Sequence, residues 1–266
     1  MRRIALGLSY SGQAYEGWQS QLSGQTLQDA LERALAQFTQ VPIRTLCAGR
    51  TDTGVHALQQ VVHFDCEIER DDISWVRGTN RYLPKDMAVE WAKEVPESFH
   101  ARRSALTRRY AYWLLNSPVR PSLGHERVGW VFRPLNLERM QRAAQTLLGT
   151  HDFSSFRAAQ CQSPTPIKTL LQADVSERKL SADRSYFCFE FEANAFLHHM
   201  IRNIVGCLVS VGQDNHPVQW IEEVLNAKNR AQAAPTFAPD GLYFLGPTYD
   251  PSYLVARVNA NWVGFI

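Results

Sequence analysis

Hydrophobic positions in the first half of the chain follow strand and helix periods in a regular order. Alternation from Ile4 to Tyr10 predicts a strand, and a stripe from Leu27 to Phe38 predicts a helix with Thr26 as its N-cap. Further strands are expected at 43–48 and 59–65, a helix at 72–82 and a strand at 87–94. The pattern therefore predicts the order strand, helix, strand, strand, helix, strand.

The second half repeats a similar order. An aromatic strand is expected at 107–116, followed by a helix that Asn136 caps. The remaining elements are strands at 166–175 and 184–193, helices at 195–211 and 217–228, and a strand at 241–249. This repetition indicates an α/β protein of two similar β-α-β-β-α-β halves. The boundary is expected near 104–105, which gives an N-terminal half of 1–105 and a C-terminal half of 106–266.

Composition narrows the class of protein. The 266 residues are 45% hydrophobic and 20% charged, with a net charge of +2, which excludes a disordered chain and a polycation. The five cysteines include no CxxC pair and predict reduced thiols rather than disulfides or a zinc finger. The longest uncharged apolar stretch, 203–213, is shorter than the ~20 residues of a membrane span. A cytoplasmic protein without membrane or export segments is therefore expected.

A glycine-containing loop at 48–57 carries the densest group of polar residues. Gly49 and Gly54 permit a tight turn that presents Asp52, and Arg50 projects to the same side as Asp52 if the segment is extended. A nearby cation favours the ionised carboxylate. Such an aspartate suits a nucleophile or an electrostatic stabiliser better than a general acid.

Two other interpretations of Asp52 compete with this one. The carboxylate can cap its own backbone in an Asx turn. Asp-Thr-Gly also occurs in aspartic proteases, but that chemistry needs two carboxylates that share a proton. This chain has no second Asp-Thr-Gly, although a homodimer could supply one, and Arg50 would oppose the shared proton.

The segment 99–125 contains five arginines and no acidic residue, interleaved with aromatic residues. This pattern suits a nucleic-acid groove, because phosphates bind the charges and bases stack on the rings. A solvated edge strand protected by its charges is the alternative. Tyr110 and Tyr112 share one face of the predicted strand, and one of the two is expected in the core.

The segment 194–206 is expected to bury an apolar helical stripe. His198 and His199 invite a metal interpretation, which is disfavoured because adjacent helical residues point about 100° apart and no third ligand is spaced nearby. Arg202 is costly to bury without a partner, and Asp52 is a natural candidate for that partner. No nucleotide-binding or metal-binding motif occurs in its required setting, so no cofactor and no metal are expected.

Together these runs resemble the bacterial tRNA pseudouridine synthase I (TruA) family. The resemblance covers nearly the whole chain. It rests on the loop 48–56 and on six other matching segments, at 17–19, 99–102, 109–112, 152–157, 199–206 and 241–243. It implies cofactor-free isomerisation of uridine to pseudouridine at positions 38 to 40 of the tRNA anticodon stem-loop, by a homodimer. It also implies antiparallel sheets joined into one central sheet, with helices on the outer faces and a basic cleft between the halves.

The resemblance assigns roles to particular residues. Asp52 matches the catalytic aspartate, and Arg202 matches the helix arginine that pairs with it. Tyr110 matches the active-site tyrosine that stacks on uracil and is a candidate for removing the C5 proton. Arg50 matches the residue that fills the space left by the flipped uridine. Phosphate contacts are expected from two further residues, Arg102 and Arg157.

Two other functions compete with pseudouridine synthesis. A non-catalytic tRNA-binding or folding factor would use the same basic surface, but it has no use for an anion facing RNA. A hydrolase acting on the glycosidic bond of nucleosides would release free uracil.

Overall fold

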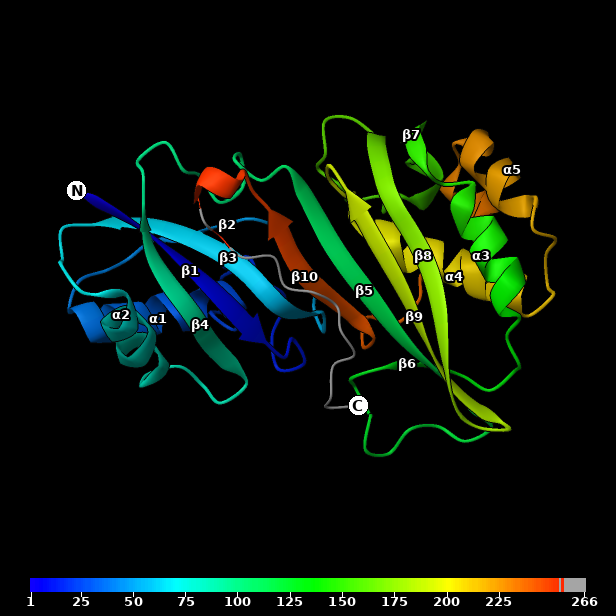
Figure 1. Cartoon of the computed structure of the whole chain (residues 1–266), viewed down its shortest axis with the longest axis horizontal. Coiled ribbons are helices and arrows are strands. Elements are labelled where there is room, and N and C mark those ends of the chain that lie inside the picture. The colour runs from blue at the N-terminus through cyan, green and yellow to red at the C-terminus, as the bar shows by residue number, and fades with distance from the viewer. Residues whose placement is uncertain (254, 256–266) are drawn as a thin grey trace. The chain divides into compact units, whose positions relative to one another are not determined.

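The computed structural model describes residues 1–253 and 255, which fall into two compact units (Figure 1). The first unit comprises Met1–Arg108 together with the described residues from Tyr243 onward. The second unit comprises Arg109–Leu242. In the described part of the chain, no helix combines the length and the apolar character needed to cross a membrane.

The sheet of the first unit is built around β1 (Arg2–Tyr10). This strand pairs antiparallel with β3 (His56–Cys66) on one side and with β4 (Met87–Val95) on the other. β2 (Leu46–Cys47) also pairs antiparallel with β3, and β10 (Leu242–Thr248) pairs with β3 in parallel. Strands from the start and the end of the sequence therefore share one sheet.

Two helices cover one face of this sheet, α1 (Leu27–Thr39) and α2 (Asp72–Asn80) (Figure 1). Thr26 caps α1 as predicted, because its side chain accepts a hydrogen bond from the backbone N–H of Asp29. Trp75 of α2 packs edge-on against both Phe38 and the β3 residue Phe64, with ring centroids 5.5 and 5.3 Å apart. The predicted order of elements in this unit is confirmed.

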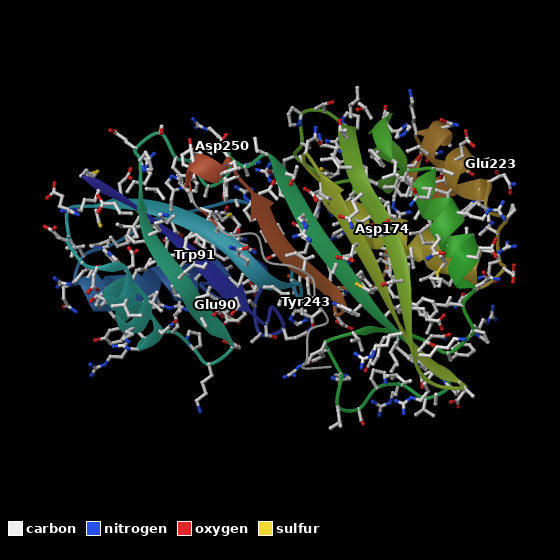
Figure 2. All side chains as sticks on the ribbon, viewed as in Figure 1. Glu90, Trp91, Asp174, Glu223, Tyr243 and Asp250 are labelled. Atoms are coloured by element: carbon white, nitrogen blue, oxygen red, sulfur yellow. The ribbon has the colours of Figure 1, made fainter. Side chains whose placement is uncertain are left out.

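The other face of the sheet packs against the segment 96–105 and the residues after β10. The buried side chains there include Val61, Phe99 and Tyr249, and the Tyr249 hydroxyl donates to the carbonyl of Ala101 at 2.6 Å. Trp91 of β4, labelled in Figure 2, lies directly over β1. A Cβ at Gly7 would meet the Trp91 ring at 2.1 Å, so the ring requires a glycine there.

The strands of the second unit lie in the order β5 (Thr107–Asn116), β9 (Arg184–Ala193), β8 (Ile167–Ser181) and β7 (Gly149–Asp152). The short strand β6 (Gly129–Val131) pairs in parallel with β5. β6 and β7 are absent from the sequence prediction, because runs of three and four residues are too short to show a period.

Three helices cover one face of these strands: α3 (Leu137–Gln145), α4 (Met200–Gly212) and α5 (Trp220–Ala227) (Figure 1). Asn136 caps α3 as predicted, by accepting a hydrogen bond from the backbone N–H of Arg139. The expected start of a helix at 195 is wrong. His199 adopts a left-handed φ of 61°, so α4 begins at Met200.

The division of the chain differs from the expected halves in two places. The first unit extends to Arg108 rather than to residue 105, because Leu106 and Thr107 hydrogen-bond to Thr248. The strand expected at 241–249 lies in the first unit from Tyr243 onward, since β10 pairs with β3. A hydrophobic pattern identifies that strand but cannot show which strand it pairs with.

Candidate functional site

The loop that carries Asp52 connects β2 to β3 in the first unit. A backbone hydrogen bond of 3.1 Å from the N–H of Val55 to the carbonyl of Asp52 closes the turn. Gly54, inside the turn, has a left-handed φ of 79°. The Asp52 side chain is half-buried, whereas Arg50 is exposed. The backbone therefore closes this turn and holds the carboxylate at its tip.

Residues on both sides of the loop fix its position. The Thr51 hydroxyl bonds the Tyr10 hydroxyl at 2.8 Å, and the Thr51 carbonyl accepts from the backbone N–H of Trp18 at 2.9 Å. A Cβ at Gly17 would lie 2.9 Å from that same carbonyl, and Gly17 has a φ of 85°. These contacts explain why the Gly17-Trp18 run accompanies the loop, since close approach of the two backbones requires a glycine.

Arginines gather beside this loop, and we call Arg50, Arg102, Arg103 and Arg108 the basic rim. Burial raises the pKa of the Cys47 thiol to about 11, against the opposing fields of Arg50 and Arg102, which both reach it. The Arg108 guanidinium donates to the carbonyls of Ala48, Ala105 and Arg102. The structure thus brings the predicted RNA contacts Arg50 and Arg102 to one region of the first unit.

Two histidines that the sequence analysis did not single out hold the segment carrying Arg102. His63 is 3% exposed, and its Nδ1 accepts from the backbone N–H of Ala101 at 3.2 Å. The Nδ1 of His100 accepts from the backbone N–H groups of Arg102 and Arg103. Burial, with a smaller contribution from neighbouring His100, lowers the pKa of His63 to about 4. Neutral imidazoles therefore fix this part of the rim. This role can be identified only from contacts in the folded structure, so the sequence contains no signal for it.

In the second unit, the two tyrosines of β5 differ in their surroundings. Tyr112 is fully buried, and its hydroxyl donates to the carbonyl of Ala238 at 2.9 Å. Burial raises the Tyr112 pKa, so this hydroxyl stays protonated. Tyr110 is 9% exposed and packs edge-on against Phe196 at 5.2 Å. Tyr112 is the core member that the strand pattern required.

Arg202 lies in the first turn of α4 and is half-buried. Its Nε donates to the carbonyl of Phe237 at 2.7 Å, and the Phe237 N–H donates back to the Arg202 carbonyl at 3.2 Å. The next residue, Asn203, is fully buried and bonds Phe156, Arg230 and Thr236. The start of α4 is therefore fixed on three sides.

The loop that begins at Arg157 contacts the segment before α4, which holds His198 and His199. The backbone N–H of Ala158 donates to the His198 carbonyl at 3.0 Å. The Arg157 guanidinium donates to the carbonyls of Cys161 and Ser163 at 2.7 and 2.8 Å, so it shapes its own loop. Although burial acts to raise it, the pKa of Cys161 is lowered by N–H groups of Ser163 and His198 and by Arg157. The His198 and His199 rings lie 4.0 Å apart. These two residues are not separated by helical geometry as predicted, since neither of them is in α4.

Known proteins resemble this chain over nearly its whole length. A family model described as tRNA pseudouridine synthase matches residues 8–102 and 143–250. The tRNA pseudouridine synthase A of Polaromonas naphthalenivorans (strain CJ2) is 64% identical over 263 residues, which covers 98% of this chain and 99% of that protein. The protein of the same name from Paracidovorax citrulli (strain AAC00-1) is 58% identical, over 94% of this chain and 95% of that protein. Likeness to solved structures is weaker: one titled Crystal Structure of a Cbf5-Nop10-Gar1 Complex aligns with a TM-score of 0.36 and 10% identity over 91% of this chain and 48% of that one.

Proposed function

Because this chain belongs to the tRNA pseudouridine synthase family, we propose that it isomerises uridine to pseudouridine at positions 38 to 40, in the anticodon stem-loop of tRNA. Family membership makes the protein an isomerase that acts on tRNA. The observation that carries the proposal is the loop between β2 and β3, which holds Asp52 half-buried beside a basic rim. The proposal includes a homodimer in the cytoplasm.

The reaction breaks the C1′–N1 bond of uridine, turns the uracil and forms a C1′–C5 bond. We assign the anionic group of this reaction to Asp52. An ionised carboxylate serves equally for attack on the sugar, attack on the base or removal of a sugar proton. The bonds that hold Thr51 and the turn support this assignment, because a catalytic group must be held in one place to react.

Tyr110 and Arg202 complete the proposed catalytic set. Stacking of the Tyr110 ring on uracil needs no change of protonation, and the ring already packs edge-on against the half-buried Phe196. The role assigned to Arg202 is to supply positive charge that favours the ionised form of the catalytic carboxylate. Their membership in one reaction with Asp52 rests on the family resemblance.

A uridine in a stem is stacked and paired, so the enzyme must flip it out, at a cost of a few kcal/mol. Arg50 is proposed to fill the vacated space, and Arg102 to bind phosphate. Exposure of both side chains supports these roles. Arg157 is proposed as a further phosphate contact, although two of its donors already bind the carbonyls of its own loop.

An unmodified tRNA transcript with tritium at C5 of its uridines tests the proposal. Formation of the C1′–C5 bond expels the C5 hydrogen, so tritium should enter water without release of free uracil. Chromatography of the products separates the competing functions. Free uracil would indicate a hydrolase, and binding without tritium release would indicate a tRNA-binding factor.

A further inference from the structure

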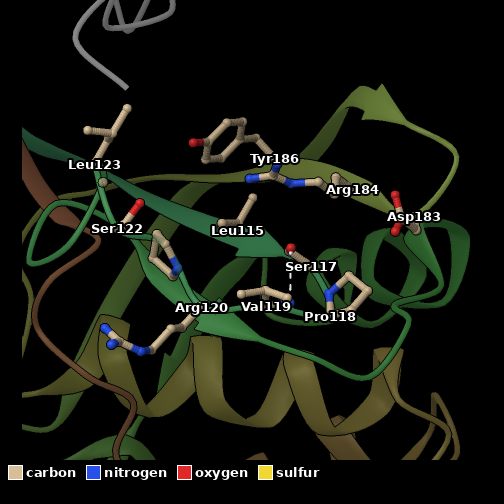
Figure 3. Close-up of a pocket in the computed structure, with 12 residues that line it drawn as sticks. Leu115, Ser117, Pro118, Val119, Arg120, Ser122, Leu123, Asp183, Arg184 and Tyr186 are labelled. Atoms are coloured by element: carbon tan, nitrogen blue, oxygen red, sulfur yellow. Dashed lines mark hydrogen bonds between the residues drawn. The ribbon is translucent and has the colours of Figure 1, made fainter.

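A cavity of about 520 Å³ lies in the second unit between two loops (Figure 3). One wall is the segment 117–124, which follows β5, and the other is the start of β9 at the β8–β9 turn. Its lining includes Leu115, Ser117, Arg120, Leu123, Arg184 and Tyr186. Its volume falls within the ~300–1,000 Å³ of pockets that bind small ligands.

The first wall is held in shape by its own bonds. Pro118 and Pro121 restrict the backbone. The Ser117 hydroxyl accepts from the backbone N–H of Val119 at 3.3 Å (Figure 3), and the Trp130 indole donates to the Ser117 carbonyl at 2.9 Å. This wall exists before any ligand binds, which reduces the entropy lost on binding.

The lining combines positive charge with an aromatic ring. Among the described residues, the guanidinium groups of Arg120 and Arg184 have neither a hydrogen bond nor an ion pair. The acidic residue of the lining, Asp183, already accepts from the Ser181 hydroxyl at 2.8 Å. Figure 3 shows the half-buried Tyr186 beside Arg184, and burial raises the Tyr186 pKa so that its hydroxyl stays neutral next to an anion.

The surroundings have the same charge and expose apolar surface. The segments 117–133 and 177–184 together carry six basic and three acidic residues. Leu123 is 97% exposed and Val119 is 70% exposed, so the edge of the cavity offers apolar contact beside the arginines. Arginine pairs with phosphate through two parallel hydrogen bonds, and rings stack on bases.

We propose that this cavity is a subsite for one unpaired nucleotide of the tRNA substrate, with phosphates on Arg120 and Arg184 and the base on Tyr186. The proposal rests on the proposed function, because it takes the ligand to be the same RNA. A protein partner that bound through the apolar edge of the cavity would leave two guanidinium groups without acceptors. A second copy of this chain meeting the same face about a two-fold axis would bring like charges together.

The double variant Arg120→Ala/Arg184→Ala tests the charged part of the subsite. We expect its affinity for an unmodified tRNA transcript to fall tenfold or more and its KM to rise, while kcat at saturating tRNA stays within twofold. The slope of log affinity against log salt should decrease by about 1.5, the value for two lost phosphate contacts. Arg142→Ala, on the exposed face of α3, removes one charge in the same unit and should stay within twofold of the wild type.

Tyr186 tests the stacking part. Tyr186→Leu should weaken tRNA binding fivefold or more, whereas Tyr186→Phe keeps the ring and should remain within twofold. The thermal unfolding midpoint of each variant should match the wild type within 2 °C, an order of change that surface substitutions give. If a variant unfolds earlier, Arg184→Gln replaces Arg184→Ala and Tyr186→Met replaces Tyr186→Leu, because these remove the charge or the ring and keep more of the side-chain volume.

Three results would overturn the subsite. These are unchanged affinity and KM in the double variant, a fall in kcat with unchanged KM, or a change in the oligomeric state measured by sedimentation. Failure of the proposed function has a different signature, because the wild type itself would then form no pseudouridine. The affinity comparison between variants remains readable in that case.

Discussion

Tyr110 and Tyr112 differ by one strand repeat and have separate tasks. The Tyr112 hydroxyl satisfies the Ala238 carbonyl inside the second unit. Tyr112→Phe leaves that acceptor unpaired and should lower the free energy of unfolding by about 1–3 kcal/mol. Urea denaturation measures the change, and an unchanged midpoint would contradict the structural role.

Tyr110 is assigned to stacking, so its ring matters more than its hydroxyl. We expect Tyr110→Phe to keep tRNA affinity within twofold and to retain turnover. Tyr110→Leu should lose about fivefold or more in kcat/KM, because stacking on a base is worth ~1–3 kcal/mol. Tritium release measures both variants. Loss of all turnover in Tyr110→Phe would show that the hydroxyl transfers a proton.

His63 should make stability depend on pH. Burial and His100 lower its folded pKa to about 4, whereas an ordinary histidine has a pKa near 6.5. The unfolded chain therefore binds the proton first as the pH falls, and stability should decrease between about pH 6.5 and pH 4, by at most ~1.4 kcal/mol per pH unit from this group.

Denaturant unfolding across that range measures the effect. His63→Gln should flatten the dependence, and the exposed residue His125 offers a control, His125→Gln, that should leave it unchanged. Equal slopes in the wild type and His63→Gln would contradict the assignment.

At the scale of elements, Glu32 of α1 anchors the segment that leads into β2 and the Asp52 loop. Glu32 is 8% exposed. Its carboxylate accepts hydrogen bonds from the Thr45 backbone N–H at 2.8 Å, from the Thr45 hydroxyl and from the Gln28 side chain. Arg44 also donates to it, but the Arg44 side chain is 85% exposed.

These contacts predict unequal effects for the two partners. Glu32→Ala should lower the free energy of unfolding by about 2–3 kcal/mol, because it removes several charged hydrogen bonds. Arg44→Ala should change it by less than ~1 kcal/mol, as an exposed ion pair contributes little. Thermal unfolding distinguishes the two, and equal losses would contradict the anchoring role.

The elements also show how far a single sequence leads. Alternation and helical stripes predicted the regular elements of the first unit and the caps Thr26 and Asn136, because these depend on local chemistry. The start of α4 depended on the left-handed backbone of His199, for which the sequence carries no signal. The pairing of β10 with β3 joins residues nearly two hundred positions apart and follows from packing alone.

The candidate site divides in the same way. Asp52, Arg50 and the two glycines form one loop, so their local arrangement could be predicted. The histidines that brace the Arg102 segment come from different strands and loops, and their role appears only after folding. The use of Arg157 donors within its own loop was equally hidden.

At the scale of the molecule, net charge understates the affinity expected for RNA. The chain carries only +2, but the basic rim collects four arginines, Arg50 and three from the segment 99–125, which has no acidic residue. tRNA affinity should therefore fall steeply with salt. Arg102→Ala should reduce the slope of log affinity against log salt by about 1, and Arg142→Ala should not. A flat salt response in the wild type would contradict binding through phosphates.

The assignment of Asp52 supports the whole account and has a direct test. In Asp52→Ala, tritium release from C5-labelled tRNA should fall below detection, while tRNA affinity measured on the same preparation stays within a few fold of the wild type. Asp52→Asn should behave alike, because it keeps the shape of the side chain and removes the charge. Residual turnover together with a large loss of affinity would contradict the central claim, since Asp52 would then be a binding residue.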